Sequence, residues 1–179
     1  EMFDTIGVKK IITACPHCFN TFKNEYPQFG KAYEVIHHSE FIRELARKGV
    51  IKNAQRFEGS GPVVYHDSCY LGRYNNLFKE PRELAKFIPG VALVEAKRRE
   101  RTGFCCGAGG GRMWMEENLG RRINAERLSQ LTATGAKTVA TACPYCMIML
   151  DDAVREKGIE GEIMVKDLAQ MVWDAIEKT

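Results

Sequence analysis

Short apolar runs alternate with amphipathic segments along the whole chain of 179 residues. The apolar runs have the length of buried strands, whereas the segments between them repeat apolar residues at helical spacing. Strands are predicted at 9–14, 33–38, 62–67, 91–96, 137–142 and 162–167, and helices at 18–26, 39–49, 80–88, 115–135, 146–158 and 168–178. Strands that alternate with helices predict an α/β fold, with Rossmann-like layers around a mostly parallel sheet.

Residues at the predicted boundaries indicate where several of these helices begin and end. Ser39 is expected to be the N-cap of helix 39–49 and Gly49 its stop, and Pro81 suits the first position of helix 80–88. The predicted helix 115–135 is the longest, and its apolar stripe consists of Leu119, Ile123, Leu128 and Leu131.

An internal repeat organises the chain. The stretch KKIITACPHCFNTF at 9–22 recurs as KTVATACPYCMIML at 137–150, and 34–45 parallels 162–173. Such self-similarity indicates a duplicated supersecondary unit. Residues 1–58 are predicted to be the C-terminal part of a truncated first copy, and residues 59–179 a complete second copy. The chain is therefore expected to be a piece of a longer protein that carries the missing cysteines.

Charge and composition narrow the class of protein. The formal net charge of +3 gives no strong attraction to nucleic acid, and no apolar run approaches the ~20 residues of a membrane span. No signal peptide precedes the first strand, so a cytoplasmic location is expected, or the cytoplasmic face of the membrane through absent segments or partners. The basic run 97–102 is expected to be solvated, with docking of an acidic redox partner as the alternative.

Cysteines supply the chemistry. The seven cysteines are an odd count without the spacings of a secreted disulfide scaffold, which favours reduced thiols that bind metal. Five of them follow predicted strands or lie in the glycine-rich loop TGFCCGAGGG at 102–111, and they are Cys69, Cys105, Cys106, Cys143 and Cys146. Loops at the carboxyl ends of parallel strands meet at one sheet edge, so these thiols are expected to converge.

Thiolates suit either zinc or an iron–sulfur cluster. Cys143 and Cys146 are expected to open a helix, where free amides stabilise anionic sulfur. Glycines such as Gly107 allow two adjacent side chains to approach one metal centre. Five thiols exceed the four that a cubane cluster or a tetrahedral zinc ion needs, which indicates an unusual cluster or one cysteine held in reserve.

The pattern C-x35-CCG-x36-CPxC, preceded by HDSC, resembles the cysteine-rich CCG domain of the heterodisulfide reductase catalytic-subunit family. Similar iron–sulfur subunits serve glycolate, lactate and anaerobic glycerol-3-phosphate oxidation, and others are quinone-linked partners of electron-transfer flavoprotein. The resemblance implies a noncubane [4Fe-4S] cluster held by those five cysteines, with zinc as the alternative. It also implies that Cys15 and Cys18 are the final CPxC of a preceding motif whose other cysteines are absent. In this chain the pair is expected either to bind metal or to be a remnant that is reduced or bridged as a disulfide.

Other residues near these cysteines have candidate roles beside ordinary structural ones. His66, and His37 and His38, end predicted strands and could donate protons or hydrogen bonds to sulfur. Asp67 is expected to organise its loop, and Arg112 to bind an acidic substrate or offset cluster charge. Four methionines are expected to fill the core around the site: Met113, Met115, Met147 and Met149.

The predicted function is electron transfer by an iron–sulfur oxidoreductase domain, between a flavin or ferredoxin donor and a disulfide or quinone. Its expected partners are a flavoprotein, a ferredoxin-type iron–sulfur domain and a membrane subunit that reacts with quinone. Cys69 and His66 are the predicted catalytic residues. The alternative is a non-catalytic relay or structural zinc module of a larger redox complex.

Overall fold

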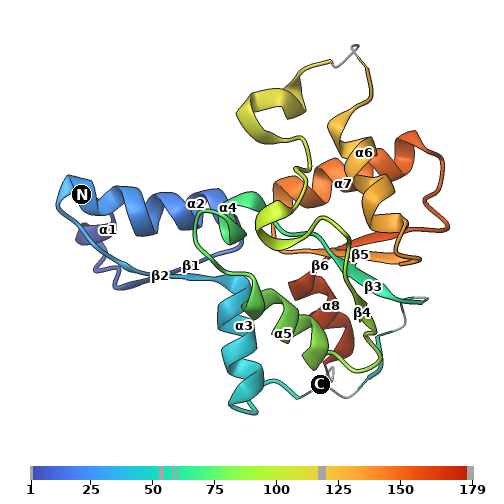
Figure 1. Ribbon diagram of the computed structural model, residues 1–179. Coiled ribbons are helices and arrows are strands. Elements are labelled where there is room, and N and C mark those ends of the chain that lie inside the picture. The colour runs from blue at the N-terminus through green and yellow to red at the C-terminus, as the bar shows by residue number, and fades with distance from the viewer. Residues whose placement is uncertain (1, 53–54, 58, 60, 117–119, 177–179) are drawn as a thin grey trace.

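The computed structural model describes residues 2–52, 55–57, 59, 61–116 and 120–176. It confirms the α/β class: two parallel sheets, one of two strands and one of four, are flanked by helices. The strands are β1 Lys10–Thr13, β2 Glu34–His37, β3 Val63–Tyr65, β4 Leu93–Val94, β5 Thr138–Thr141 and β6 Met164–Asp167. The larger sheet has the order β4-β3-β5-β6 (Figure 1).

Helices connect consecutive strands. The α-helices are α1 Met2–Thr5, α2 Pro16–Asn20, α3 His38–Arg47, α4 Cys69–Gly72, α5 Lys79–Phe87, α6 Ile123–Thr132, α7 Pro144–Glu156 and α8 Leu168–Ala175. A π-helical turn at Thr21–Glu25 and a 3-10 turn at Tyr26–Phe29 extend α2, and further 3-10 turns lie at Glu100–Thr102 and Gly109–Trp114.

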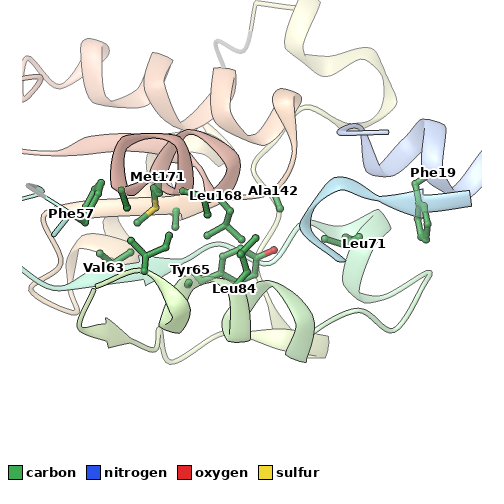
Figure 2. Packing of buried hydrophobic residues seen from close by; sticks show 14 residues of the cluster. Phe19, Phe57, Val63, Tyr65, Leu71, Leu84, Ala142, Leu168 and Met171 are labelled. Carbon is green, nitrogen blue, oxygen red and sulfur yellow. The ribbon is translucent and has the colours of Figure 1, made fainter. Parts of the chain in front are cut away.

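Both faces of the four-stranded sheet are covered by helices (Figure 1). Alternate strand residues point to opposite faces, so Val63 and Tyr65 pack toward α5 and α8, whereas Val64 packs toward α6 and α7. Figure 2 shows the first cluster, in which Val63, Tyr65 and Leu84 lie together and Leu71 and Phe19 extend the packing toward α2. This core fixes the strand ends from which the candidate site is built.

The predicted helix boundaries need correction at three places. The N-cap of α3 is His37 rather than Ser39, because the His37 side chain accepts a hydrogen bond from the Ser39 amide and Glu40 completes a capping box. Helix α5 begins at Lys79, so Pro81 occupies its third position. Helix α4, which begins at Cys69, was not predicted.

The long helix predicted at 115–135 is wrong over its first part. Helix α6 begins only at Ile123, since Gly120 has a positive φ of 69° and Arg122 is not helical at ψ 137°. Its predicted stripe residue Leu119 lies outside the described residues. The glycines upstream therefore lead into a short 3-10 turn and not into a long helix.

The repeat is visible in the strands and their caps. Strand β5 begins 128 residues after β1, as the sequence repeat predicts, but β6 begins 130 residues after β2. The capping boxes of α3 and α8 make His37 equivalent to Asp167. The predicted alignment of 34–45 with 162–173 is therefore displaced by two residues.

Candidate metal centre

The site lies at the carboxyl edge of the four-stranded sheet. After β3 the chain runs through His66 and Asp67 into α4, whose first residue is Cys69. After β5 it reaches Cys143, the N-cap residue of α7. The glycine-rich loop brings the remaining cysteines to the same edge, so the predicted convergence is observed for Cys69, Cys105, Cys106, Cys143 and Cys146, here called the thiol cluster.

The sulfurs of the thiol cluster form a continuous chain of contacts. Cys105 interacts with both Cys69 and Cys106. Cys106 continues the chain to Cys146, which in turn meets Cys143. None of the five cysteines forms a disulfide, and Cys106, Cys143 and Cys146 are at most 4% exposed. Such a closely spaced set of soft donors has the composition of a metal or iron–sulfur site.

Two of the sulfurs are favoured as thiolates. Contacts from Cys106 and Cys69, together with the Gly107 amide at 3.3 Å, hold the pKa of Cys105 well below its usual range. The neighbouring Cys146 thiol is the main cause that lowers the pKa of Cys143 to about 5. Amides at the start of α7 add to this effect, as expected for sulfur at a helix N-terminus.

The other three cysteines are favoured as protonated thiols. The contact with Cys105 is the largest cause that raises the pKa of Cys69, and it raises the pKa of Cys106 to about 12. The contact with Cys106 raises the pKa of Cys146 as well. Each thiolate thus has a thiol as its neighbour in the chain of sulfurs, and Cys106 and Cys146 are two adjacent thiols. A metal centre that took all five would release the remaining protons.

Gly107 is required by the loop. Its φ is 95°, and a β-carbon at this position would lie 3.2 Å from Cβ of Ile123. Glycine alone adopts this conformation without strain and permits the close approach to the start of α6. The position also directs the Gly107 amide toward the Cys105 sulfur.

His66 lies against the thiol cluster. A ligand nitrogen of His66 and the sulfurs of Cys106 and Cys146 all lie within 4.8 Å of one another, and all three residues are buried. The His66 Nδ1 atom accepts a hydrogen bond from Nε of Arg127 at 3.0 Å. Burial, aided by the Arg127 charge, lowers the pKa of His66 to about 3.

Asp67 organises the loops on either side of the site, as predicted. Its carboxylate forms a bidentate pair with Arg82, at 2.7 and 3.0 Å, and accepts the Glu100 amide at 2.8 Å. The first contact fixes the segment before Cys69. The second fixes the 3-10 turn that precedes the glycine-rich loop.

The first CPxC motif lies beside the second. The Cys15 sulfur is 3.8 Å from Nδ1 of His17, and the His17 side chain also contributes to the lowered pKa of Cys143. Cys18 is exposed, and partial burial together with the neighbouring Cys15 raises its pKa. The two motifs are therefore linked through His17, a residue for which the sequence alone indicated no role.

The remaining candidates are dispersed. His37 caps α3 and reaches the Ala14 carbonyl at 3.3 Å, whereas Nε2 of His38 is hydrogen-bonded to Asp167 at 2.9 Å. Arg112 lies on an exposed turn. Met113 and Met149 pack in the same apolar cluster as the cysteines, but Met115 is exposed and Met147 lies outside that cluster.

Two buried arginines were missed, although one left a signal in the sequence. Arg127 lies four residues after Ile123 and four before Leu131, and so on the apolar stripe of α6. A charged residue at such a position marks a special environment. Arg82 carries no comparable signal, because its helix has charged residues on several sides.

Comparison with known proteins agrees with this geometry. The cysteine-rich CCG domain family matches residues 63–151, which contain the whole thiol cluster. Residues 63–151 belong to this family. The flanking residues are also shared with longer relatives, since alignments to several of them cover almost the whole chain.

Three relatives illustrate the similarity of this chain to longer proteins. The "Probable iron-sulfur-binding oxidoreductase FadF" of Bacillus subtilis is 45% identical over 97% of the chain, and the "EtfAB:quinone oxidoreductase" of Syntrophomonas wolfei is 40% identical over 99%. A subunit of the "Dihydromethanophenazine:CoB--CoM heterodisulfide reductase" of Methanosarcina barkeri is 34% identical over 98%. The chain spans 24%, 25% and 43% of these relatives, respectively.

The donor set fits an iron–sulfur cluster. Five cysteine sulfurs are joined by one chain of contacts at the sheet edge, and two of them are favoured as thiolates. They offer the ligand type that such clusters require. The Bacillus subtilis relative is named as an iron–sulfur-binding protein. Within the described part of the chain, no helix has the length and apolarity to cross a membrane.

Proposed function

We propose that this chain is an electron-transfer domain of an iron–sulfur oxidoreductase, in which the thiol cluster binds one [4Fe-4S] cluster of the noncubane type. The convergence of five cysteine sulfurs into one chain of contacts carries the proposal. When bound, the iron–sulfur group supplies one-electron redox chemistry. The protein's own part is to hold the ligands, exclude water and set the charge around them.

The donor is proposed to be a flavoprotein or a ferredoxin-type domain, and the acceptor a quinone or a disulfide. Quinone is favoured because the relative named for quinone is 40% identical, against 34% for the heterodisulfide reductase relative. The whole protein would then work with other redox subunits at the cytoplasmic face of a membrane. Catalytic participation of Cys69 belongs to the disulfide alternative, since Cys69 is only half-buried at the end of the sulfur chain.

Metal content tests the cluster directly. After anaerobic reconstitution, the wild-type protein is expected to hold about four irons and about four sulfides per chain. Cys106→Ser should lose most of this iron, because its sulfur lies between those of Cys105 and Cys146. Cys18→Ser is the matched control, since Cys18 is exposed and lies outside the thiol cluster. About one zinc per chain, or equal iron in both variants, would contradict the proposal.

The acceptor is tested on the full-length protein. Quinone reduction is supported if a chemically reduced sample is reoxidised by a soluble quinone but not by a disulfide. Disulfide chemistry instead predicts that adding a thiol to the oxidised protein changes the paramagnetic resonance signal of the cluster. The two results distinguish the acceptors without depending on the identity of the donor.

A further inference from the structure

Arg127 is a buried cation without a carboxylate partner among the described residues. The side chain is 0% exposed, yet its Nη1 atom donates only to the Arg98 carbonyl at 2.9 Å and, at 3.4 Å, to Gln130. Nη2 is buried with no hydrogen-bond partner in the described structure. A buried guanidinium costs several kcal/mol unless negative charge lies nearby.

Two sources of negative charge act on Arg127: the Asp67 carboxylate and the thiol cluster. The sulfurs of Cys146 and Cys106 both act on Arg127 electrostatically, although neither forms a direct hydrogen bond with it. Asp67 has the larger effect of the two sources, but its carboxylate is already held in the bidentate pair with Arg82. Loading the thiol cluster with an anionic iron–sulfur group would supply the charge that Arg127 lacks.

The hydrogen bond between Arg127 and His66 can have only one direction. A guanidinium only donates hydrogen bonds, so Nδ1 of His66 must accept the bond from Nε of Arg127 at 3.0 Å. A neutral imidazole with an accepting Nδ1 carries its proton on Nε2. That nitrogen then has no lone pair for a metal, but it has an N–H to donate.

We propose that Arg127 is the counter-charge of the cluster and a positioning residue for His66, which it holds with its Nε2–H available to a cluster sulfur. His66 is then a hydrogen-bond donor and neither a metal ligand nor a source of protons. A cation and a donor close to the thiolates stabilise the reduced, more negative state. The pair therefore raises the reduction potential of the cluster.

This inference rests on the iron–sulfur group of the proposed function, so one of its two tests is independent of iron. In the metal-free protein labelled with nitrogen-15, long-range proton–nitrogen correlation reports which ring nitrogen of His66 is protonated. His66→Gln identifies the signal by its loss. The proton is expected on Nε2. A proton on Nδ1, or on both nitrogens at neutral pH, would overturn the proposal.

The second test is the reduction potential of the reconstituted protein. Arg127→Met keeps the length of the side chain but removes its charge and donors, and it should weaken one-electron reduction at least about tenfold, which corresponds to about 59 mV. Arg121→Met removes the same charge from an exposed side chain near the start of α6, and Gln130→Ala removes one contact of Arg127. Both controls are expected to keep the wild-type potential.

The outcomes separate this proposal from the proposed function. An unchanged potential in Arg127→Met, with normal iron content, refutes the role of Arg127 and leaves the cluster intact. If Arg127→Met does not bind iron, Arg127→Lys decides the question: it keeps the charge but not the directed bond to His66, so its potential should lie below that of the wild type. Wild-type protein without iron would refute the proposed function and leave the tautomer of His66 as a separate result.

Discussion

Replacing Arg82 by methionine should destabilise the protein through the charge that it leaves behind. Arg82 is 10% exposed in its side chain and Asp67 is 3% exposed, and the two form a bidentate pair at 2.7 and 3.0 Å. Arg82 also binds Glu95 at 2.7 and 2.9 Å and the Phe78 carbonyl at 2.9 Å. After Arg82→Met, Asp67 keeps the Glu100 amide but loses its buried cation.

The expected loss of unfolding free energy is about 3–5 kcal/mol, the usual effect of removing one partner of a buried ion pair. The contact with the partly exposed Glu95 adds less than about 1 kcal/mol. For a chain of this size, the loss corresponds to a decrease in Tm of roughly 6–20 °C. Iron content should fall as well, because Asp67 connects the segment before Cys69 to the turn before the glycine-rich loop.

Urea unfolding of the wild type and three variants measures the effect. Arg155→Met is the matched control: its ion pair with Asp151 is exposed, so the change should stay within about 1 kcal/mol. Adding Asp67→Asn to Arg82→Met removes the stranded charge and should restore about 1–3 kcal/mol. Two results would refute the explanation that Arg82→Met destabilises the protein by leaving Asp67 as a buried, unpaired charge. Either Arg82→Met lowers the free energy of unfolding by less than about 1 kcal/mol, or the double variant is no more stable than the single variant.

Two further predictions concern the glycine-rich loop and acid stability. Gly107→Ala should destabilise the protein by about 1–3 kcal/mol and reduce iron binding, since φ is 95° and the added carbon meets Ile123 at 3.2 Å. Gly109→Ala, with open space around it, should be close to neutral in the same thermal and iron assays; equal effects would contradict this account. Burial lowers the pKa of His37 from 6.5 to about 3. Below pH 6.5, His37 therefore binds a proton in the unfolded chain but stays neutral in the folded chain. Stability should therefore fall by up to about 1.4 kcal/mol per pH unit down to about pH 3. His37→Asn keeps an N-cap residue and should flatten this dependence between pH 7 and 5; a profile as steep as that of the wild type would refute it.

The sequence predicted the fold class and the convergence of the cysteines, because both follow from short-range patterns. Strand periodicity places Cys69 after β3 and Cys143 after β5, and parallel neighbours in one sheet must bring such ends to one edge. Helix boundaries were less predictable where side chains compete for the same amides. At α3, His37 caps the helix and Ser39 does not, because the helix begins at His38, directly after the last residue of β2.

Contacts between charged residues that are far apart in the chain could not be predicted from the sequence. Arg82 and Asp67 are separated by 15 residues, and Arg127 and His66 by 61, so no local pattern links either pair. The position of Arg127 on an apolar stripe shows that it is unusual, but not what it faces. Only the packing of α6 against the sheet brings the guanidinium beside the end of β3.

Several of these contacts occur at equivalent positions of the two repeated segments. In both copies a CPxC motif opens a helix after a strand, and the next strand ends in a capping box, formed at His37 in one copy and Asp167 in the other. The copies meet through these same elements, since His38 pairs with Asp167 and His17 lies beside Cys143. Equivalent edges of the two sheets therefore face one another. A change at the first CPxC, such as His17→Ala, should for this reason raise the pKa of the Cys143 thiol and leave the pKa of Cys69 unchanged.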